Sequence, residues 1–297
     1  YRFGAAGPAG VPPCDQAKHV GQQGGIAGVL AKVTAAAPGE YQAVRSQSIE
    51  RLSMDGTMDV QLPAEEKDKN GDASSVRYGV GGIVGYAYLA NEGEGVTKLN
   101  TCENHADVTG NLFTGGIVGK LEGSTKNGKG LSKADHAVAS VAGSSNDGLI
   151  LSSVSANDKT FAGQYFGGIT GYSYNAVLYD CETASGRARG YSYDSAQQDK
   201  VLKGDYVGGI VGYGNYTILS NCETQKNGYV LGENYVGGIA GYGKTLSDCR
   251  SLVTVDGGAY TGAIAGDVDE DGSVTGCLFT HETLGAIDGI SYAGKAE

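Results

Sequence analysis

Short apolar segments recur along the chain at a fixed distance from paired glycines. The pattern Gly-Gly/Ala-Ile-any-Gly occurs eight times, flanked by β-branched and aromatic residues, as in YVGGIVGY and YTILSNC. Asn, Asp and Gly punctuate these runs, which is typical of short strands joined by tight turns. The pattern therefore predicts a repeated all-β unit. The first glycines of the eight copies are Gly24, Gly81, Gly115, Gly167, Gly208, Gly237, Gly262 and Gly285.

The distance between copies shortens toward the C-terminus. Successive spacings are 57, 34, 52, 41, 29, 25 and 23 residues. The shortest spacings predict a unit of about 23–29 residues, with longer units carrying insertions. We expect the long insertions around residues 29–78, 120–165 and 172–203. VLAKVTAAAP, which follows Gly28, is the one segment that favours a short helix, ending before Pro38.

A second column follows the glycine motif in the segments LNTCEN, LYDCET, LSNCET, LSDCRS and VTGCLF. Alignment of ILSSVS places Val154 in this column, and the spacing of LSMDGTMDV places Met54 there. Because Cys, Val and Met alternate at one position, it is predicted to point into an apolar core. Cys14 repeats the spacing, which predicts a degenerate unit before Gly24. The cysteines of the column are Cys102, Cys181, Cys222, Cys249 and Cys277.

Aromatic residues form two further columns. One lies two residues before the motif, at Phe113, Tyr165, Tyr206, Tyr235 and Tyr260. The other follows the motif directly, at Tyr86, Tyr172, Tyr213 and Tyr242, with Lys120 and Asp267 in two copies. Such columns could bind glycans by stacking, or could close the core with their hydroxyls in water. The absence of Trp and the regular repetition favour the structural interpretation.

Units of this length, built from short strands and glycine corners, are typical of one coil of a β-solenoid. Each coil would add one rung to parallel sheets, with identical positions stacked about 4.8 Å apart. We therefore predict one all-β domain over residues 1–297, a right-handed parallel β-helix of about eight or nine coils. A propeller is the main alternative, but its blades need about 40–50 regular residues, and the shrinking period argues against it.

The segments YVGGIVGYGNYTILSNCET and YVGGIAGYGKTLSDCRS resemble the GLUG repeat, with Ile210 and Ile239 in place of the leucine. The resemblance covers most of the chain and is strongest from Tyr165 to Phe279. Similar repeats occur in large bacterial surface proteins, including adhesins and the flanks of some immunoglobulin A metallopeptidases. The resemblance implies an extracellular protein on a bacterial cell surface, and it implies no defined ligand.

Composition narrows the function classes. Many of the 51 glycines lie in the motif, keep no three-residue period and accompany only 5 prolines, which excludes collagen. The formal net charge of −11, without a basic cluster, disfavours nucleic acid and anionic lipid as partners. The sequence contains no run of 18 apolar residues, so it predicts no membrane-spanning helix. The opening YRFGAAGPAG has no initiator Met or signal segment, so we expect a mature or excised piece of a longer protein.

The six cysteines allow two interpretations. An exported protein meets oxidising conditions that favour disulfides, but stacked side chains point in parallel and leave their Cβ atoms too far apart for an ordinary bridge. Buried free thiols are therefore favoured. No CxxC or CxxH spacing indicates zinc. His281-Glu282 begins a metallopeptidase-like HExxH, but Gly285 stands where the second histidine is needed.

Of the local motifs, DVDEDGS points most specifically to a ligand. Asp267, Asp269 and Asp271, followed by Gly272, reproduce the first half of a calcium loop, in which alternating carboxylates converge on one cation. Leu278 stands at the twelfth position, where the loop needs a bidentate acid. The sequence thus gives a weak calcium candidate, and the alternative is a solvated acidic corner.

Carboxylates also follow the column cysteines. Glu103, Glu182 and Glu223, with Arg250 next in line, are expected to point outward. Some β-helices cleave polysaccharides with clustered carboxylates and a basic residue, whereas most such rows are hydrated faces with ion pairs. No catalytic residue or cofactor site is predicted. We expect a non-catalytic adhesin or stalk module that displays loops to a host or bacterial surface glycan or protein. The alternative is a β-helix that binds or cleaves polysaccharide.

Overall fold

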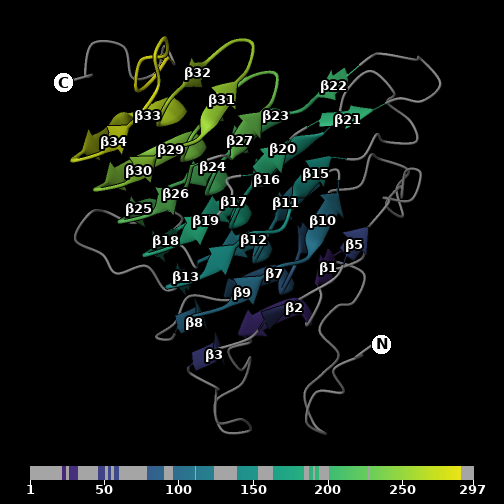
Figure 1. Ribbon diagram of the computed structural model, residues 1–297. Coiled ribbons are helices and arrows are strands. Elements are labelled where there is room, and N and C mark those ends of the chain that lie inside the picture. The colour runs from purple at the N-terminus through teal and green to yellow at the C-terminus, as the bar shows by residue number, and fades with distance from the viewer. Residues whose placement is uncertain are drawn as a thin grey trace, which may run out of the picture.

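The computed structural model of the protein contains only β-strands and turns in the part of the chain that it describes. The chain passes through four parallel sheets in turn and then returns to the first sheet one rung further along (Figure 1). The described residues are 22–24, 27–32, 46–50, 53–54, 57–59, 79–89, 96–110, 112–123, 139–152, 163–183, 187–189, 191–193, 201–226 and 228–288.

Sheet I contains the residues that lead into the glycine pair. Its order follows the sequence, so each strand hydrogen-bonds to the equivalent strand of the neighbouring coil. Its strands are β1 (Gln22–Gly24), β6 (Gly79–Gly81), β11 (Leu112–Gly115), β16 (Gln164–Gly167), β23 (Asp205–Gly208), β28 (Val236–Gly237) and β32 (Thr261–Gly262).

Sheet II is twice as wide, because each coil crosses it with two consecutive strands or with one long one. The strands after the glycine corner are β2 (Ala27–Lys32), β7 (Val84–Leu89), β12 (Val118–Glu122), β17 (Thr170–Tyr174) and β24 (Val211–Asn215). The second strands are β3 (Ser46–Glu50), β8 (Val96–Asn100), β13 (Ala139–Ala142), β18 (Ala176–Tyr179) and β25 (Ile218–Ser220). In the last two coils, β29 (Ala240–Ser247) and β33 (Ala265–Thr275) span both halves.

Sheets III and IV complete the coil. Sheet III consists of two-residue strands: β4 (Ser53–Met54), β9 (Glu103–Asn104), β14 (Ser145–Asn146), β19 (Glu182–Thr183), β26 (Glu223–Thr224), β30 (Arg250–Ser251) and β34 (Leu278–Phe279). Sheet IV consists of β5 (Thr57–Asp59), β10 (Asp107–Gly110), β15 (Ile150–Ser152), β20 (Arg187–Arg189), β27 (Tyr229–Leu231) and β31 (Thr254–Asp256). A separate antiparallel hairpin joins β21 (Tyr191–Tyr193) to β22 (Val201–Lys203).

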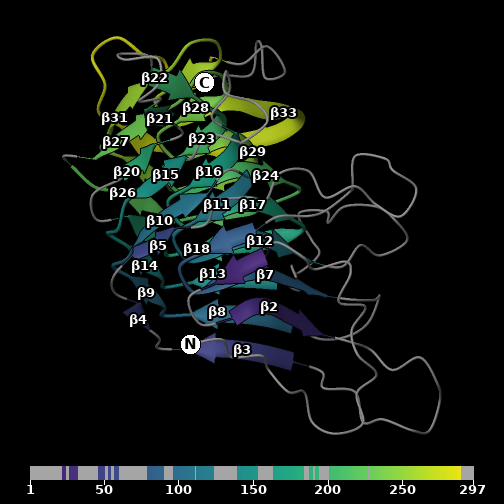
Figure 2. The same cartoon turned by 90° about the vertical axis from the view of Figure 1, so that its right-hand side faces the viewer.

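The rungs are parallel and in register, which confirms the predicted parallel β-solenoid. Thr170, for example, pairs with Val118 on one side and Val211 on the other. Figure 2 shows the rungs stacked from the N-terminal strands to the C-terminal ones. The described residues contain seven successive coils, and a bridge between Ala265 and Ile287 begins a further one. The degenerate unit expected at Cys14 lies outside the described residues, and the right-handed sense stays a prediction.

Strands of the coil run through all three ranges in which insertions are predicted. Strands β2 to β5 lie within or overlap residues 29–78, strands β13 to β15 lie within 120–165, and strands β18 to β20 lie within 172–203. The hairpin of β21 and β22, in the connection that follows β20, is an addition outside the four sheets. The extra residues are therefore confined to shorter connections between these strands. Three connections join the two halves of sheet II in three neighbouring coils. Two of them, residues 33–45 and 124–138, lie in the predicted ranges, and the third, residues 90–95, lies outside them.

The predicted helix after Gly28 is wrong over its first residues. Residues 29–32 belong to β2, which pairs with β7 through partners such as Leu30 and Ala87. Pairing with the next coil forms a parallel ladder along β2, and this tertiary context outweighs the helix propensity of Leu, Ala and Lys. The remainder of the predicted helix lies outside the described residues.

Two placements in the cysteine column are also wrong. Ser145 pairs with Glu103 and Glu182, so the column position between Cys102 and Cys181 belongs to Ser144. Val154 lies outside the described residues, and the segment aligned with it begins in β15 of sheet IV. Met54 pairs with Asn104, two residues beyond the column. In both coils the sequence alignment placed an apolar residue in the column, whereas pairing with the neighbouring rungs places a different residue there.

Glycines of the motif lie where two backbones touch. A Cβ added to Gly208 would lie 2.0 Å from the carbonyl oxygen of Val211, and one added to Gly212 would lie 2.6 Å from Phe166 N. A Cβ on Gly209 would meet the carbonyl oxygen of Gly238 at 2.1 Å. None of the described motif glycines has a positive φ. These glycines are therefore required where backbones approach too closely to leave room for a methyl group. Gly285 is an exception, since an added Cβ would have its nearest neighbour at 3.9 Å.

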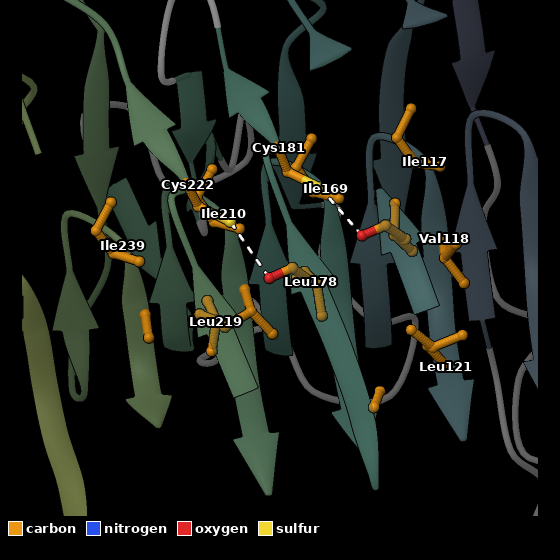
Figure 3. Close-up of a cluster of buried hydrophobic side chains, with 14 of the residues drawn as sticks. Ile117, Val118, Leu121, Ile169, Leu178, Cys181, Ile210, Leu219, Cys222 and Ile239 are labelled. Carbon is orange, nitrogen blue, oxygen red and sulfur yellow. Dashed lines mark hydrogen bonds between the residues drawn. The ribbon is translucent and has the colours of Figure 1, made fainter. Parts of the chain in front are cut away.

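The interior is divided into two cores. The larger one lies on the inner face of sheet II and contains the motif isoleucines, such as Ile169 and Ile210, together with the column cysteines (Figure 3). The smaller one lies between sheets I and IV and contains Val207, Val230 and Phe166. Between them, each second glycine of the motif faces a buried polar residue of sheet III, and in successive coils these are Asn104, Asn146, Thr183, Thr224 and Ser251.

A methyl group at Gly209 is expected to destabilise the protein by about 3 kcal/mol or more, because its contacts are backbone oxygen and the Cγ2 of Thr224 at 2.5 Å. Gly214→Ala is the matched control, since its nearest neighbours lie at 3.4 Å and it belongs to the same coil. Denaturant unfolding of Gly209→Ala and Gly214→Ala measures both changes. Equal losses in the two variants would show that close approach is not why the motif needs glycine.

Candidate functional site

The two aromatic columns form one stacked arrangement, which we call the aromatic ladder. Its outer row has neighbouring ring centroids 4.5–5.2 Å apart and nearly parallel. Its inner row stacks at 5.6 Å and 4.8 Å. Edge-to-face contacts, such as Tyr206 with Tyr213 at 5.1 Å, join the rows. The outer row is Phe113, Tyr165, Tyr206, Tyr235 and Tyr260, and the inner row is Tyr172, Tyr213 and Tyr242.

Stacking decides between the two interpretations of these rings. A sugar binds an aromatic side chain through a free ring face. Tyr165, Tyr206 and Tyr235 each have a neighbouring ring on both faces, so only their edges are left for another molecule. The ladder therefore serves as a structural spine between rungs.

Outer-row residues adopt a backbone conformation that is rare for bulky side chains. Their φ values lie between 54° and 67°, in the left-handed region. Each such residue costs of order 1 kcal/mol or more, and each aromatic pair stabilises by about 0.5–1.5 kcal/mol beyond its burial. Ring stacking therefore offsets the strain of the turn that starts each glycine corner.

Lys120 occupies the inner row in place of a tyrosine. Its Nζ lies 5.1 Å from the ring centroid of Tyr86 and 5.2 Å from that of Tyr172, one on each neighbouring rung. The Glu122 carboxylate lies 2.5 Å from this ammonium group and also accepts a hydrogen bond from the Tyr86 hydroxyl. A cation between two ring faces continues the ladder electrostatically, because ring faces carry negative charge density.

Outward carboxylates of sheet III lie in line as predicted. Glu182 and Glu223 pair on neighbouring rungs, and Arg250 follows, with its guanidinium 2.9 Å from Glu223. Gln225 donates a hydrogen bond to Glu182, and the imidazole of His105 lies 3.6 Å from Glu103. The row is thus a surface on which each of these carboxylates has a charged or polar neighbour.

The calcium candidate lies in β33. Relative to β29 the register shifts between Gly243 and Thr245, so the segment that contains Asp269 and Asp271 protrudes from the rung (Figure 2). Asp267 is buried and accepts a hydrogen bond from Val268 N, whereas Asp269 binds Lys244 Nζ at 2.7 Å.

Among the described residues, which include this whole segment, no three His, Cys, Asp or Glu side chains gather as a group that could hold a metal ion. Contacts with Lys244 and with the backbone of Asp271 hold the pKa of Asp269 below its usual value against the effect of its burial. The carboxylates of Asp267 and Asp269 therefore serve separate local contacts here, and the calcium hypothesis stays a prediction.

His281 does not belong to a metallopeptidase arrangement in the described part of the chain. Its Nδ1 accepts hydrogen bonds from the backbone N–H groups of Thr283 and Leu284, at 3.3 Å and 3.1 Å, which fixes the turn into the Gly285 motif. This turn lines a hollow of about 450 Å³ at the C-terminal end, together with Asp256, Thr261 and Asp288.

Column cysteines stabilise the corner that precedes sheet III. The residue before each cysteine has a positive φ, as at Asp180 (50°), Asn221 (52°) and Asp248 (54°). Each thiol lies near the carbonyl oxygen two residues earlier, at 3.4 Å for Cys222 and Ser220. Ser144 makes the same contact with Ala142 at 3.0 Å. From Cys102 onward the column therefore combines a small side chain that can donate a hydrogen bond with a mostly buried position.

All five described cysteines have free thiols, and four of them are buried. Contact with the neighbouring Cys222 thiol, with burial adding to it, raises the pKa of Cys249 to about 12. The pKa of Cys222 is raised as well, first through its contact with Cys181. A neutral thiol is a poor nucleophile, so Cys222 and Cys249 are chemically protected at neutral pH.

Comparisons of the sequence with family models, with curated proteins and with solved structures gave no match. Within the described residues, the chain forms no helix long and apolar enough to cross a membrane. The assignment of function therefore depends on the geometry of the chain itself.

Tyr206 tests the ladder. Removing its ring in Tyr206→Ala is expected to cost about 2 kcal/mol or more, since two stacked neighbours lose a partner. Tyr206→Phe keeps both stacks and should stay within about 1 kcal/mol of the wild type at pH 7. Denaturant unfolding at pH 7 compares the two variants. Equal losses would show that the ladder depends on the hydroxyl rather than on stacking.

The pH dependence of the stability of Tyr206→Phe provides a second test of the ladder. Desolvation, together with the nearby Tyr235, raises the pKa of Tyr206 in the folded protein. Its contribution to stability is present below the unfolded pKa of about 10 and is lost as pH rises above it. Tyr206→Phe should therefore lose stability less steeply than the wild type between pH 9 and 11, a window set by that unfolded value of about 10.

Buried thiols should resist alkylation. In folded protein at a pH of about 8, iodoacetamide is expected to leave Cys102, Cys181, Cys222 and Cys249 unmodified, because they are buried and a raised pKa keeps Cys222 and Cys249 protonated. Denaturation without reductant should expose all of them to labelling. Peptide mass spectrometry distinguishes the states, and a thiol that reacts only after reduction would reveal a disulfide.

Proposed function

We propose that the chain is a non-catalytic display module of an extracellular bacterial surface protein, either an adhesin or a stalk. The observation that carries the proposal is the shared position of three of the connections between strands. Residues 33–45, 90–95 and 124–138 all join the first and second strands of sheet II, in three neighbouring coils. Variable segments at one shared corner of a repeated scaffold are typical of binding surfaces in repeat proteins.

Later coils show that the scaffold does not need these connections. In the fourth coil only Asn175 separates β17 from β18, and its φ of 48° makes the turn. Gly123 precedes the long connection of the third coil, and its N–H donates to Tyr174 as that of Asn175 donates to Asn215, one rung further on. The extra residues are therefore additions to a complete coil, which supports a role outside folding.

The resemblance to GLUG repeats supports the same location and role. Exported repeat proteins hold binding segments away from the cell, and a stack of hydrogen-bonded rungs resists bending. A formal charge of −11 suits a solvated surface module. We propose a host or bacterial glycan or protein as the partner, recognised by the segments at the shared corner.

Deletion of residues 124–138 tests the proposal. Joining Gly123 to Ala139 reproduces the short corner of the next coil, because Ala139 pairs with Ala176. The thermal midpoint should change by only a few degrees, as expected for a change of about 1 kcal/mol or less. Binding to arrays of glycans and host matrix proteins should fall at least about tenfold, equivalent to about 1.4 kcal/mol.

Two outcomes would contradict the proposal. Unchanged binding after shortening of all three connections would place recognition elsewhere on the rod. Release of new reducing or unsaturated ends from acidic polysaccharides would show that the chain is an enzyme. Glu223→Gln would then serve as the first variant, because Glu223 lies in the outward row beside Arg250.

A further inference from the structure

Four column cysteines occupy consecutive rungs without interruption. Glu182 pairs with Glu223, Glu223 with Arg250, and Arg250 with Leu278, so the cysteines that precede them lie on adjacent rungs. Cys102 is separated from this row by Ser144. The thiol row is therefore Cys181, Cys222, Cys249 and Cys277.

All four side chains have the same orientation. Each Sγ lies 3.4–3.6 Å from the carbonyl oxygen two residues earlier in its own coil. Figure 3 shows Cys181 and Cys222 on neighbouring rungs, beside the stacked isoleucines Ile169 and Ile210. With identical orientation, neighbouring sulfur atoms are separated by about one rung, or about 4.8 Å.

This separation suits a linear bridge by a soft cation. Thiolate sulfur is the ligand that favours Cu(I) among biological metals, and Cu(I) and Ag(I) both accept two sulfurs in a line. A metal–thiolate bond of about 2.3 Å gives two sulfurs about 4.6 Å apart across one ion. A tetrahedral zinc site needs four converging ligands, which a straight row does not provide.

We propose that the thiol row binds Cu(I) or Ag(I) between neighbouring cysteines, one ion for Cys181 and Cys222 and one for Cys249 and Cys277. In each step two S–H bonds break, two metal–sulfur bonds form, and two protons leave to water. The metal enters and stays in its +1 state, so no electron is transferred.

Burial and access both fit this chemistry. Cys181, Cys222 and Cys249 are at most 1% exposed, which shields the ions from water and from oxidants. Cys277 is only partly buried and forms the open end of the row. Each bridged pair carries one net negative charge, in place of the two that unbridged thiolates would bring into the core.

Counting bound ions in serine variants tests the proposal. Serine preserves the corner, as Ser144 does with its hydrogen bond to Ala142. The full chain, with Cys14 and Cys102 replaced by serine, is incubated anaerobically with Cu(I) and a competing chelator, desalted and analysed for metal. One ion for each of the two proposed pairs, Cys181 with Cys222 and Cys249 with Cys277, gives about two ions per chain. This number should fall to about one in Cys222→Ser.

Adjacency provides the matched control. Cys181→Ser/Cys222→Ser retains two neighbouring thiols, whereas Cys222→Ser/Cys277→Ser retains two thiols that are two rungs apart. The first variant should keep about one ion and the second none, although both have the same number of thiols. Equal retention would overturn the proposal, as would loss of the strand circular-dichroism signal when metal binds or the absence of bound metal in the four-thiol chain.

Discussion

In-register pairing of each coil with the next is the constraint on which the rest of the structure depends. Because rungs lie about 4.8 Å apart, every side chain is placed next to its own equivalent. A position is stable only if its residue tolerates a copy of itself at that distance. Aromatic rings meet this condition by stacking and thiols by their small size. Glu223, which lies next to Glu182 on one rung, is compensated by its ion pair with Arg250 on the other.

Corners impose a second condition, because the chain must turn sharply several times in each coil. Non-glycine residues such as Tyr235 and Asp248 make these turns with positive φ. Glycine is required instead where backbones touch, as at Gly209. Backbone strain at the turns and close backbone contact therefore occur at different residues. The side chains that stack between coils compensate for the strained turns.

Much of this architecture could be predicted from the sequence, because repetition exposes it. The glycine motif, the five column cysteines and the aromatic rows all fall where the pairing places them. Alignment by apolar residues failed where a coil departs from the consensus. The polar residue Ser144 occupies the column position between Cys102 and Cys181, where an apolar residue was expected. The same weakness made the strand at Ala27–Lys32 look helical, because its pairing partner lies far along the chain.

Inward polar residues of sheet III were missed for a related reason. Asn104 and Thr183 resemble turn residues by type, yet both are fully buried against the second glycine of the motif. A signal was available, since the position two residues after the column cysteine holds Asn, Thr or Ser in four copies. Contacts that depend on side-chain position, such as Lys120 between Tyr86 and Tyr172, could not be read from the sequence.

The confinement of extra residues to the corners has a consequence for the dimensions of the molecule. Motif spacing varies from 57 to 23 residues, yet each coil contributes one rung to every sheet it enters. The height gained per coil, about 4.8 Å, is independent of how many residues the coil contains. The reach of such a rod is therefore set by the number of glycine motifs, while its girth can change coil by coil without altering that reach.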